Sequence, residues 1–283
     1  MTAPTASRRG PFDGFFDDAA LFPPGDAPMA RAVPAHRELR ARLGALVGPF
    51  VVPAARLDEL SAHVSGDAPF AVSVIAAPGD LPSAVGRVLA HPAFTLAAVE
   101  VPIAADVRRA VTALDDLLPD AVPAGVGVPR GAGRGAVLDV LAVSRYRAKL
   151  RTGGLRADAF PSPAELAGAL RACVTRGVAV KCTAGLHHAV RHTDPVTGFR
   201  HHGFLNVLLA VSALVDGASA DDVAALLGES DGHGVAAAVR AWTPERAARA
   251  RGVFTAFGTC SVQEPVDDLV ALGLLSLSDR IPS

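Results

Sequence analysis

The chain has 283 residues, of which half are apolar, and its 28 acidic and 27 basic residues give a formal net charge of −1 at pH 7. It lacks the clustered cations that a nucleic-acid-binding face or a membrane-surface helix requires. Its apolar stretches are broken within about ten residues by proline, glycine or charge, which is too short to cross a bilayer.

The N-terminus and the cysteines predict a cytoplasmic protein. No apolar run follows Arg8 and Arg9, so we expect no signal peptide. The cysteines at positions 173, 182 and 260 are odd in number and widely spaced, which is typical of reduced thiols rather than of a disulfide framework.

Strand-like and helix-like segments alternate along the chain after a lead-in, residues 1–13, that we expect to be disordered. Eight short apolar segments have the character of strands: residues 15–22, 50–52, 70–75, 94–101, 126–128, the two segments that carry Lys149 and Lys181, and 253–257. The segments between and after them have helical spacing: residues 29–47, 57–64, 81–90, 106–118, 135–143, 163–176, 203–215, 221–227, an alanine-rich stretch to about 251, and 266–275.

Local signals mark two of the helix ends. Gly48 and Pro49 are expected to end the first helix, because neither residue favours a helix interior. Ser162 is a good N-cap for the helix that follows the first lysine segment, with Pro163 in its first turn.

This alternation predicts a parallel sheet covered on both faces, and a closed (β/α)8 barrel is the simplest arrangement of eight such strands. The predicted domain spans residues 14–283, with a histidine-rich insertion at about 187–250 between the seventh and eighth strands. An open doubly wound sheet is the alternative, but the first strand is followed by no GxGxxG turn. The glycine-rich segment 131–135 matches neither dinucleotide nor phosphate-loop spacing and is interpreted as a loop.

Lysine is scarce: Lys149 and Lys181 are the two lysines among 27 basic residues, so the other 25 (27 − 2) are arginines. An amine can lose its proton and attack a carbonyl, whereas arginine stays charged. Strand alternation places both lysines, together with Arg151 and Thr183, inside the barrel. Neighbouring strands lie about 4.8 Å apart. Two ammonium groups at that distance repel, so we expect one amine to be neutral near pH 7, as Schiff-base catalysis needs.

Three segments around these lysines carry a family resemblance: Lys149-Leu150-Arg151-Thr152-Gly153, Lys181-Cys182-Thr183-Ala184-Gly185-Leu186 and Gly258-Thr259-Cys260-Ser261. They resemble the K-x-x-T-G, K-x-[ST]-x-G-[IL] and G-T-S-[ST] motifs of the deoxyribose-phosphate aldolase branch of the class I aldolase barrels.

The resemblance implies that Lys149 forms the imine and that Lys181 favours the uncharged form of its neighbour. It also implies that the backbone amides of Gly185, Gly258 and Thr259 meet a phosphate or carboxylate at a helix N-terminus. Glu100 stands in place of the family's proton-shuttling aspartate, and Val262 in place of a glycine after Ser261.

Five of the nine histidines lie between His187 and His202. One or two of them, His187 and His188 first, are candidates for general acid or base because the unperturbed pKa of histidine is near 6.5. If the segment is helical, His188 and His192 share one face and could bind a metal. A surface loop is the plain alternative for His201 and His202.

Several further residues are candidates. The groups expected to bind the substrate or an anion are Arg151, Thr152, Thr183, Gly185, Arg191, His202, Asn206, Gly258, Thr259 and Ser261. Asp17 and Asp18 could place a carboxylate in the barrel mouth, although adjacent acids are usually a solvated turn. Glu264 is expected to cap the last helix, and Cys182 to pack between the sheet and the helices.

The function expected from these residues is an imine-forming, aldolase-like lyase that acts on a small carbonyl or sugar-derived anionic substrate without a cofactor. One alternative is a metal-dependent lyase, isomerase or hydrolase that uses the histidine loop. The other is a catalytically silent barrel that binds a metabolite. The sequence does not determine the substrate or whether the chain forms homo-oligomers.

Overall fold

The computed structural model describes residues 10–66 and 68–276. The strands are β1 (Phe16–Asp18), β2 (Val47–Pro53), β3 (Phe70–Ile75), β4 (Phe94–Val101), β5 (Ala124–Gly127), β6 (Arg147–Arg151), β7 (Val180–Thr183), β8 (His192–Thr193), β9 (Arg200–His201) and β10 (Phe254–Thr259). The α-helices are α1 (Met29–Leu43), α2 (Leu57–His63), α3 (Leu81–Ala90), α4 (Val107–Leu117), α5 (Arg134–Leu141), α6 (Pro163–Val174), α7 (Phe204–Val215), α8 (Ala220–Gly228), α9 (Gly232–Arg240), α10 (Pro244–Val253) and α11 (Gln263–Ala271).

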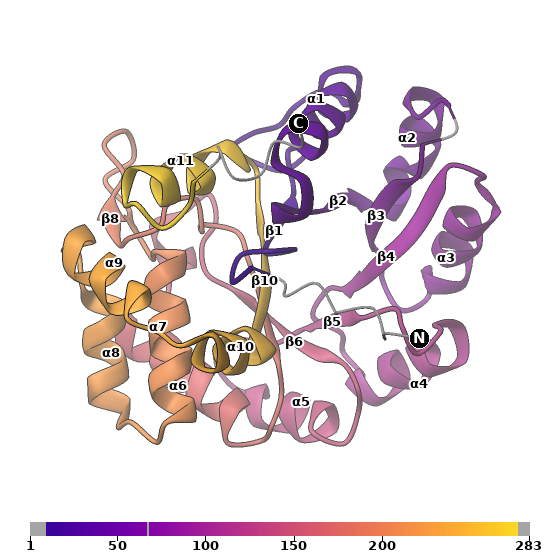
Figure 1. Cartoon of the computed structure of the whole chain (residues 1–283). Coiled ribbons are helices and arrows are strands. Elements are labelled where there is room, and N and C mark those ends of the chain that lie inside the picture. Colours follow the sequence, from indigo (N-terminus) through magenta and orange to yellow (C-terminus); the bar gives the residue numbers. More distant parts are fainter. Residues whose placement is uncertain (1–9, 67, 277–283) are drawn as a thin grey trace, which may run out of the picture.

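Eight of these strands close into a parallel barrel in the order β1-β10-β7-β6-β5-β4-β3-β2. Helices alternate with the strands and surround them (Figure 1). The predicted single (β/α)8 barrel is therefore confirmed, and the open doubly wound sheet was wrong. Strands β3 and β4 and helix α3 have the predicted bounds.

Several predicted element boundaries were wrong, among them those of α1, α10 and α11. Helix α1 ends at Leu43, because Gly44 follows it at φ 56°, and Gly48 and Pro49 belong to β2. The alanine-rich stretch is divided into α9 and α10, since Thr243 caps a new helix that has proline at its first position. Helix α11 begins at Gln263, three residues before the predicted start.

A cluster of phenylalanine rings packs where the barrel closes on itself. Phe15 lies 4.9 Å from Phe254, and Phe204 of the insertion stacks at 5.2 Å on Phe257. Phe12 is also buried, so residues 10–13 of the expected lead-in form a turn against the core, while residues 1–9 lie outside the described residues. These rings fix β1 between β10 and β2.

The insertion between β7 and β10 has two parts. Strands β8 and β9 form a small antiparallel hairpin, apart from the barrel, with His192 paired to His201. Helices α7 to α10 follow, and α8 packs beside α6 and α7 on the outside of the barrel (Figure 1). The hairpin is thus the part of the insertion nearest the carboxyl end of β7.

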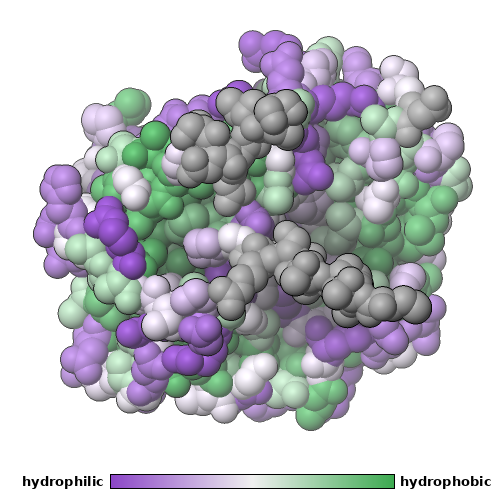
Figure 2. All heavy atoms as spheres, in the orientation of Figure 1, coloured by the Kyte–Doolittle hydropathy of each residue, from purple (hydrophilic) through white to green (hydrophobic). Residues whose placement is uncertain are grey.

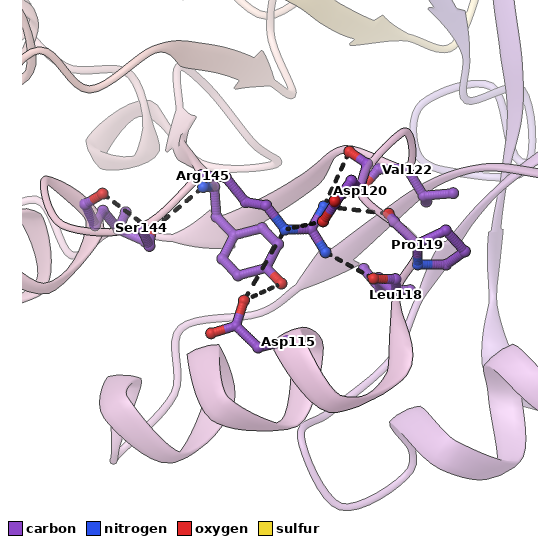
Figure 3. Close-up of polar contacts among 9 residues, drawn as sticks. Asp115, Leu118, Pro119, Asp120, Val122, Ser144 and Arg145 are labelled. Carbon is purple, nitrogen blue, oxygen red and sulfur yellow. Dashed lines mark hydrogen bonds and ion pairs between the residues drawn. The ribbon is translucent and has the colours of Figure 1, made fainter.

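Arg145 fixes the beginning of β6 (Figure 3). Its guanidinium donates to the carbonyl oxygens of Leu118 at 2.7 Å and Asp120 at 3.1 Å, in the loop before β5. Next to it, the buried Tyr146 donates to Asp115 of α4 at 2.7 Å. These contacts tie the start of β6 to the neighbouring βα unit, and so set the height of Lys149 in the barrel.

Hydrophilic residues occupy much of the edge of the face shown in Figure 2, and hydrophobic ones gather on its left and right sides. Among residues 10–66 and 68–276, no helix has the length and apolar character needed to traverse a bilayer.

Candidate active site

A cavity of about 950 Å³ opens at the carboxyl ends of the barrel strands. Active sites of (β/α)8 barrels lie at this face, where the βα loops converge. Among the residues predicted from the sequence, those that line the cavity are Glu100, Lys149, Arg151, Thr183, Gly185, His187, His188 and Gly258. The hairpin and the loop before α6 supply further walls.

Four charged side chains from four strands meet at the base of this cavity. The Nζ atom of Lys149 lies 2.5 Å from Oε2 of Glu100 in an ion pair. Lys181 lies deeper, 1 % exposed, and donates from Nζ to both Oε1 of Glu100 and Oδ2 of Asp17. Lys149 and Lys181 are paired in register on β6 and β7, as the alternation predicts. Glu100 therefore bridges the two amines.

The carboxylates decide the charge of the buried amine. Burial disfavours the charged form of Lys181, but Asp17 and Glu100 outweigh this and raise the pKa of Lys181 above its usual value. Burial also disfavours the charged form of Glu100, but Lys181 and Lys149 outweigh it and lower the pKa of Glu100. Lys181 is thus a cation. Repulsion between the lysines, on which the sequence prediction of a neutral amine relied, does not remove its proton.

Asp17 is a member of the site that the sequence analysis named as a weaker candidate than a solvated turn. It is 3 % exposed, and burial raises its pKa, although Lys181 opposes this. The interpretation of Asp17 and Asp18 as a solvated turn was wrong, because both lie in β1 and point to opposite faces. Asp18 pairs instead with His36 of α1 at 2.9 Å. Gly48 makes room for Asp17, since a Cβ there would lie 2.0 Å from Oδ1 of Asp17.

The histidine-rich segment lines one side of the cavity and is not helical between residues 188 and 192. His188 and His192 therefore do not share the face of a helix, on which the predicted metal site depended. The His188 and His192 rings are nevertheless 4.6 Å apart, because the hairpin folds back. His201 lines the cavity as well, so the surface-loop alternative does not describe it.

Two of these histidines are tied to helix α11. His187 Nδ1 lies 3.1 Å from Glu264 and 3.7 Å from the sulfur of Cys260. Burial opposes its charge, but the hydrogen bonds to Cys260 and Glu264 outweigh burial and raise the pKa of His187 to about 9. His188 Nδ1 lies 3.1 Å from Asp268, and this hydrogen bond raises the pKa of His188. A neighbouring carboxylate therefore favours the charged form of each ring.

The glycines of the two lysine motifs face an aromatic ring. A Cβ on Gly185 would lie 2.7 Å from Cα of Gly153 and 3.0 Å from Cε1 of Phe160. Gly185 also has φ +78°, a conformation that favours glycine. Thr152 is buried and donates to the carbonyl of Ala184 at 2.6 Å. These residues hold the β6 and β7 loops together and let the Phe160 ring lie on them.

Three expected substrate-binding residues have structural partners instead. Asn206 is buried, accepts from the backbone N–H of Arg191 at 2.8 Å, and donates to the carbonyls of Leu226 and Glu229. His202 is buried and lies 2.7 Å from the carbonyl of Pro161. Arg191, His202 and Asn206 do not line the cavity but fix the hairpin to the surrounding loops.

The turn after β10 presents a different residue from those expected. Thr259 is 2 % exposed and donates its hydroxyl to the carbonyl of Ser261 at 3.1 Å, so it is used within the turn. Gly258 and Cys260 reach the cavity, whereas Thr259 and Ser261 do not line it. Cys182 is fully buried, and burial raises its pKa, in keeping with a packing role.

Within the described part of the chain, no three histidine, cysteine, aspartate or glutamate side chains converge on a point that could hold a metal ion. No protein-family description and no curated protein matches the chain. The (β/α)8 barrel is a fold that commonly carries enzyme sites, and the residues at its carboxyl-end cavity must supply the argument for a particular reaction.

Proposed function

We propose that the protein is a lyase of the class I aldolase type, in which Lys149 forms an imine with a carbonyl substrate. The observation that carries the proposal is the position of Glu100 between two amines, one at the cavity surface and one beneath it. Lys149 lines the cavity and is within reach of a substrate, whereas Lys181 is buried.

Glu100 is the group that can move the protons of this reaction. Oε2 of Glu100, 2.5 Å from Nζ, takes one proton from the Lys149 ammonium, and the nitrogen lone pair then attacks the carbonyl carbon. Glu100 gives this proton to the carbonyl oxygen, which becomes a hydroxyl, and then moves a second proton from the carbinolamine nitrogen to that hydroxyl, which leaves as water. Glu100 takes the β-hydroxyl proton of the substrate as the iminium accepts the electrons of the breaking carbon–carbon bond, and one carbonyl product leaves. The proton passes to the enamine carbon, and water hydrolyses the iminium to release the second carbonyl product and the Lys149 amine.

Lys181 supports this chemistry by its charge. Asp17 and Glu100 keep its amine protonated, so a cation stands beside Lys149. In the enamine intermediate the same cation remains available to stabilise negative charge that develops near Glu100.

Reductive trapping tests the proposal. The protein is incubated with acetaldehyde and borohydride, digested, and its peptides are analysed by mass spectrometry. The expected result is an adduct on Lys149 that disappears in Lys149→Met. Two results would contradict the proposal. One is labelling of the N-terminal amine without labelling of Lys149, and the other is an equal total amount of label in the wild-type protein and in Lys149→Met.

A further inference from the structure

One wall of the cavity is made of uncharged rings. Phe160 lies 5.7 Å from Phe199 and 4.4 Å from His201, measured between ring centroids. Burial, together with the nearby His192 and His187, lowers the pKa of His201 to about 4, so this imidazole is neutral at pH 7. Burial also lowers the pKa of His192. Phe160 lies in the loop before α6, and Phe199 and His201 lie in the hairpin. All three rings line the cavity.

Apolar side chains extend this wall to the mouth of the cavity. Leu155 and Val196 line the cavity and are 70 % and 90 % exposed, and Ile103 is 62 % exposed. Large apolar side chains that are exposed together around a concave site mark a surface that a ligand covers. The ring wall and these three side chains all belong to the lining of the same cavity.

The charged groups of the cavity are largely satisfied by the protein. Glu100 balances Lys149, and Glu264 balances His187. Asp194 accepts from the backbone N–H of Thr197 at 2.7 Å and from its hydroxyl at 2.7 Å, within the hairpin loop. Arg151 lines the cavity without a carboxylate partner among the described residues. It is exposed, so water screens its charge.

Helix α11 presents a carboxylate where a phosphate would be expected. A helix N-terminus favours an anion, but the first turn of α11 already contains Glu264, whose pKa is lowered by its hydrogen bond to His187. Glu264 already compensates the charge of His187 at this turn, so a phosphate there would have to compete with Glu264 for that cation. The Phe160 ring likewise lies against Gly185, whose amide was expected to meet an anion.

We propose that the wall of Phe160, Phe199 and His201 is a subsite for an uncharged aromatic group of the carbonyl substrate, and that Glu264 disfavours a phosphorylated one. This inference rests on the proposed function for the reacting carbonyl, but the subsite itself does not require the imine. A volume of about 950 Å³ is at the upper end of the range of ligand pockets. Lys149 and the ring wall line this one cavity.

Trapping with matched aldehydes tests the subsite in the wild-type protein. Phenylacetaldehyde and glyceraldehyde phosphate are compared as substrates for borohydride trapping, with acetaldehyde as the probe of imine formation alone. Half-saturation is expected at a concentration at least tenfold lower for phenylacetaldehyde than for glyceraldehyde phosphate. Half-saturation at a lower concentration of the phosphorylated aldehyde would overturn the inference while leaving the imine intact.

Two pairs of variants locate the effect. Phe199→Ala is expected to raise the half-saturating concentration of phenylacetaldehyde about tenfold, whereas Phe94→Ala, a half-buried ring outside the cavity, leaves it unchanged. Glu264→Gln is expected to lower the value for glyceraldehyde phosphate about tenfold, and the exposed Glu245→Gln should not. Equal behaviour within either pair would contradict the assigned role.

A non-reactive ligand separates this inference from the imine. Calorimetric titration of Lys149→Met with phenylethanol, which has no carbonyl group, is expected to show binding that Phe199→Ala weakens and that glycerol phosphate does not reproduce. If acetaldehyde trapping fails but phenylethanol binds, the proposed function is wrong and the subsite stands. If acetaldehyde is trapped but phenylethanol does not bind, the subsite is wrong.

Discussion

Lys149 and Glu100 meet across an intervening strand, with Nζ 2.5 Å from Oε2. Strand β5 lies between β4 and β6, and Gly125 is its residue in register with Glu100. A Cβ on Gly125 would lie 3.7 Å from Cβ of Lys149. Because glycine occupies this position, no side chain separates the acid from the amine.

Replacing Glu100 should slow imine formation. Glu100→Gln keeps the shape of the side chain but removes the group that accepts the Nζ proton. We expect the rate of imine formation to fall about 10²- to 10⁴-fold, as is typical for loss of a general acid–base. Stopped-flow or quenched trapping measures this rate, and Glu245→Gln is the control. An unchanged rate would assign proton transfer to another group.

Replacing Asp17 should destabilise the fold more than replacing a surface acid. Asp17→Asn leaves the buried Lys181 with one carboxylate, and breaking a buried pair costs about 3–5 kcal/mol. Asp58→Asn breaks a pair with Arg87 in which the Asp58 side chain is 92 % exposed, and exposed pairs contribute about 0–1 kcal/mol. Urea unfolding of both variants measures the difference. Similar midpoints would mean that Lys181 finds another partner.

The His187–Glu264 pair should make stability depend on alkaline pH. The pKa of His187 is raised to about 9, so the folded state binds more protons than the unfolded state between about pH 6.5 and 9. Stability is therefore expected to fall as pH rises through this window, by up to about 3 kcal/mol. In His187→Gln the loss should vanish, whereas the exposed His233→Gln should retain it. Urea midpoints at pH 6.5, 8 and 9.5 test this.

Gly185 should be less tolerant of a side chain than another glycine of similar conformation. Gly217 has φ +89° with open space around it, so Gly217→Ala incurs only the conformational cost, of about 1 kcal/mol. Gly185→Ala adds a clash of 2.7 Å with the Gly153 backbone and should cost clearly more. Thermal unfolding compares the two variants. Equal shifts would show that the β6 and β7 loops can move apart.

The barrel and its lysines could be predicted because both depend on regular patterns. Alternation along a strand fixes which side chains face inward, and this placed Lys149 and Lys181 together, while the family resemblance pointed to Glu100. The same rule applied to the predicted strand at residues 15–22 would have turned either Asp17 or Asp18 inward, but an adjacent acidic pair is more often a solvated turn.

The roles of the other residues could not be predicted, because the type of a residue does not reveal which group its side chain contacts in the fold. Asn206 and His202 have side chains suited to a substrate, but their hydrogen bonds go to backbone carbonyls of distant loops. Phe160 lies in a loop without periodicity, so no sequence pattern indicates that its ring covers Gly185. The pairing of His187 with Glu264 joins segments separated by 77 positions and depends on closure of the barrel.

The inward-facing charges are divided between the two halves of the polypeptide by sign. Asp17 and Glu100 belong to the first half, and Lys149 and Lys181 to the second. Each half-barrel alone would expose an interior of one sign, and the two surfaces attract each other. Charge complementarity therefore favours assembly of the N-terminal half with the C-terminal half over self-association of either. Two separately expressed halves should accordingly associate with each other rather than with copies of themselves.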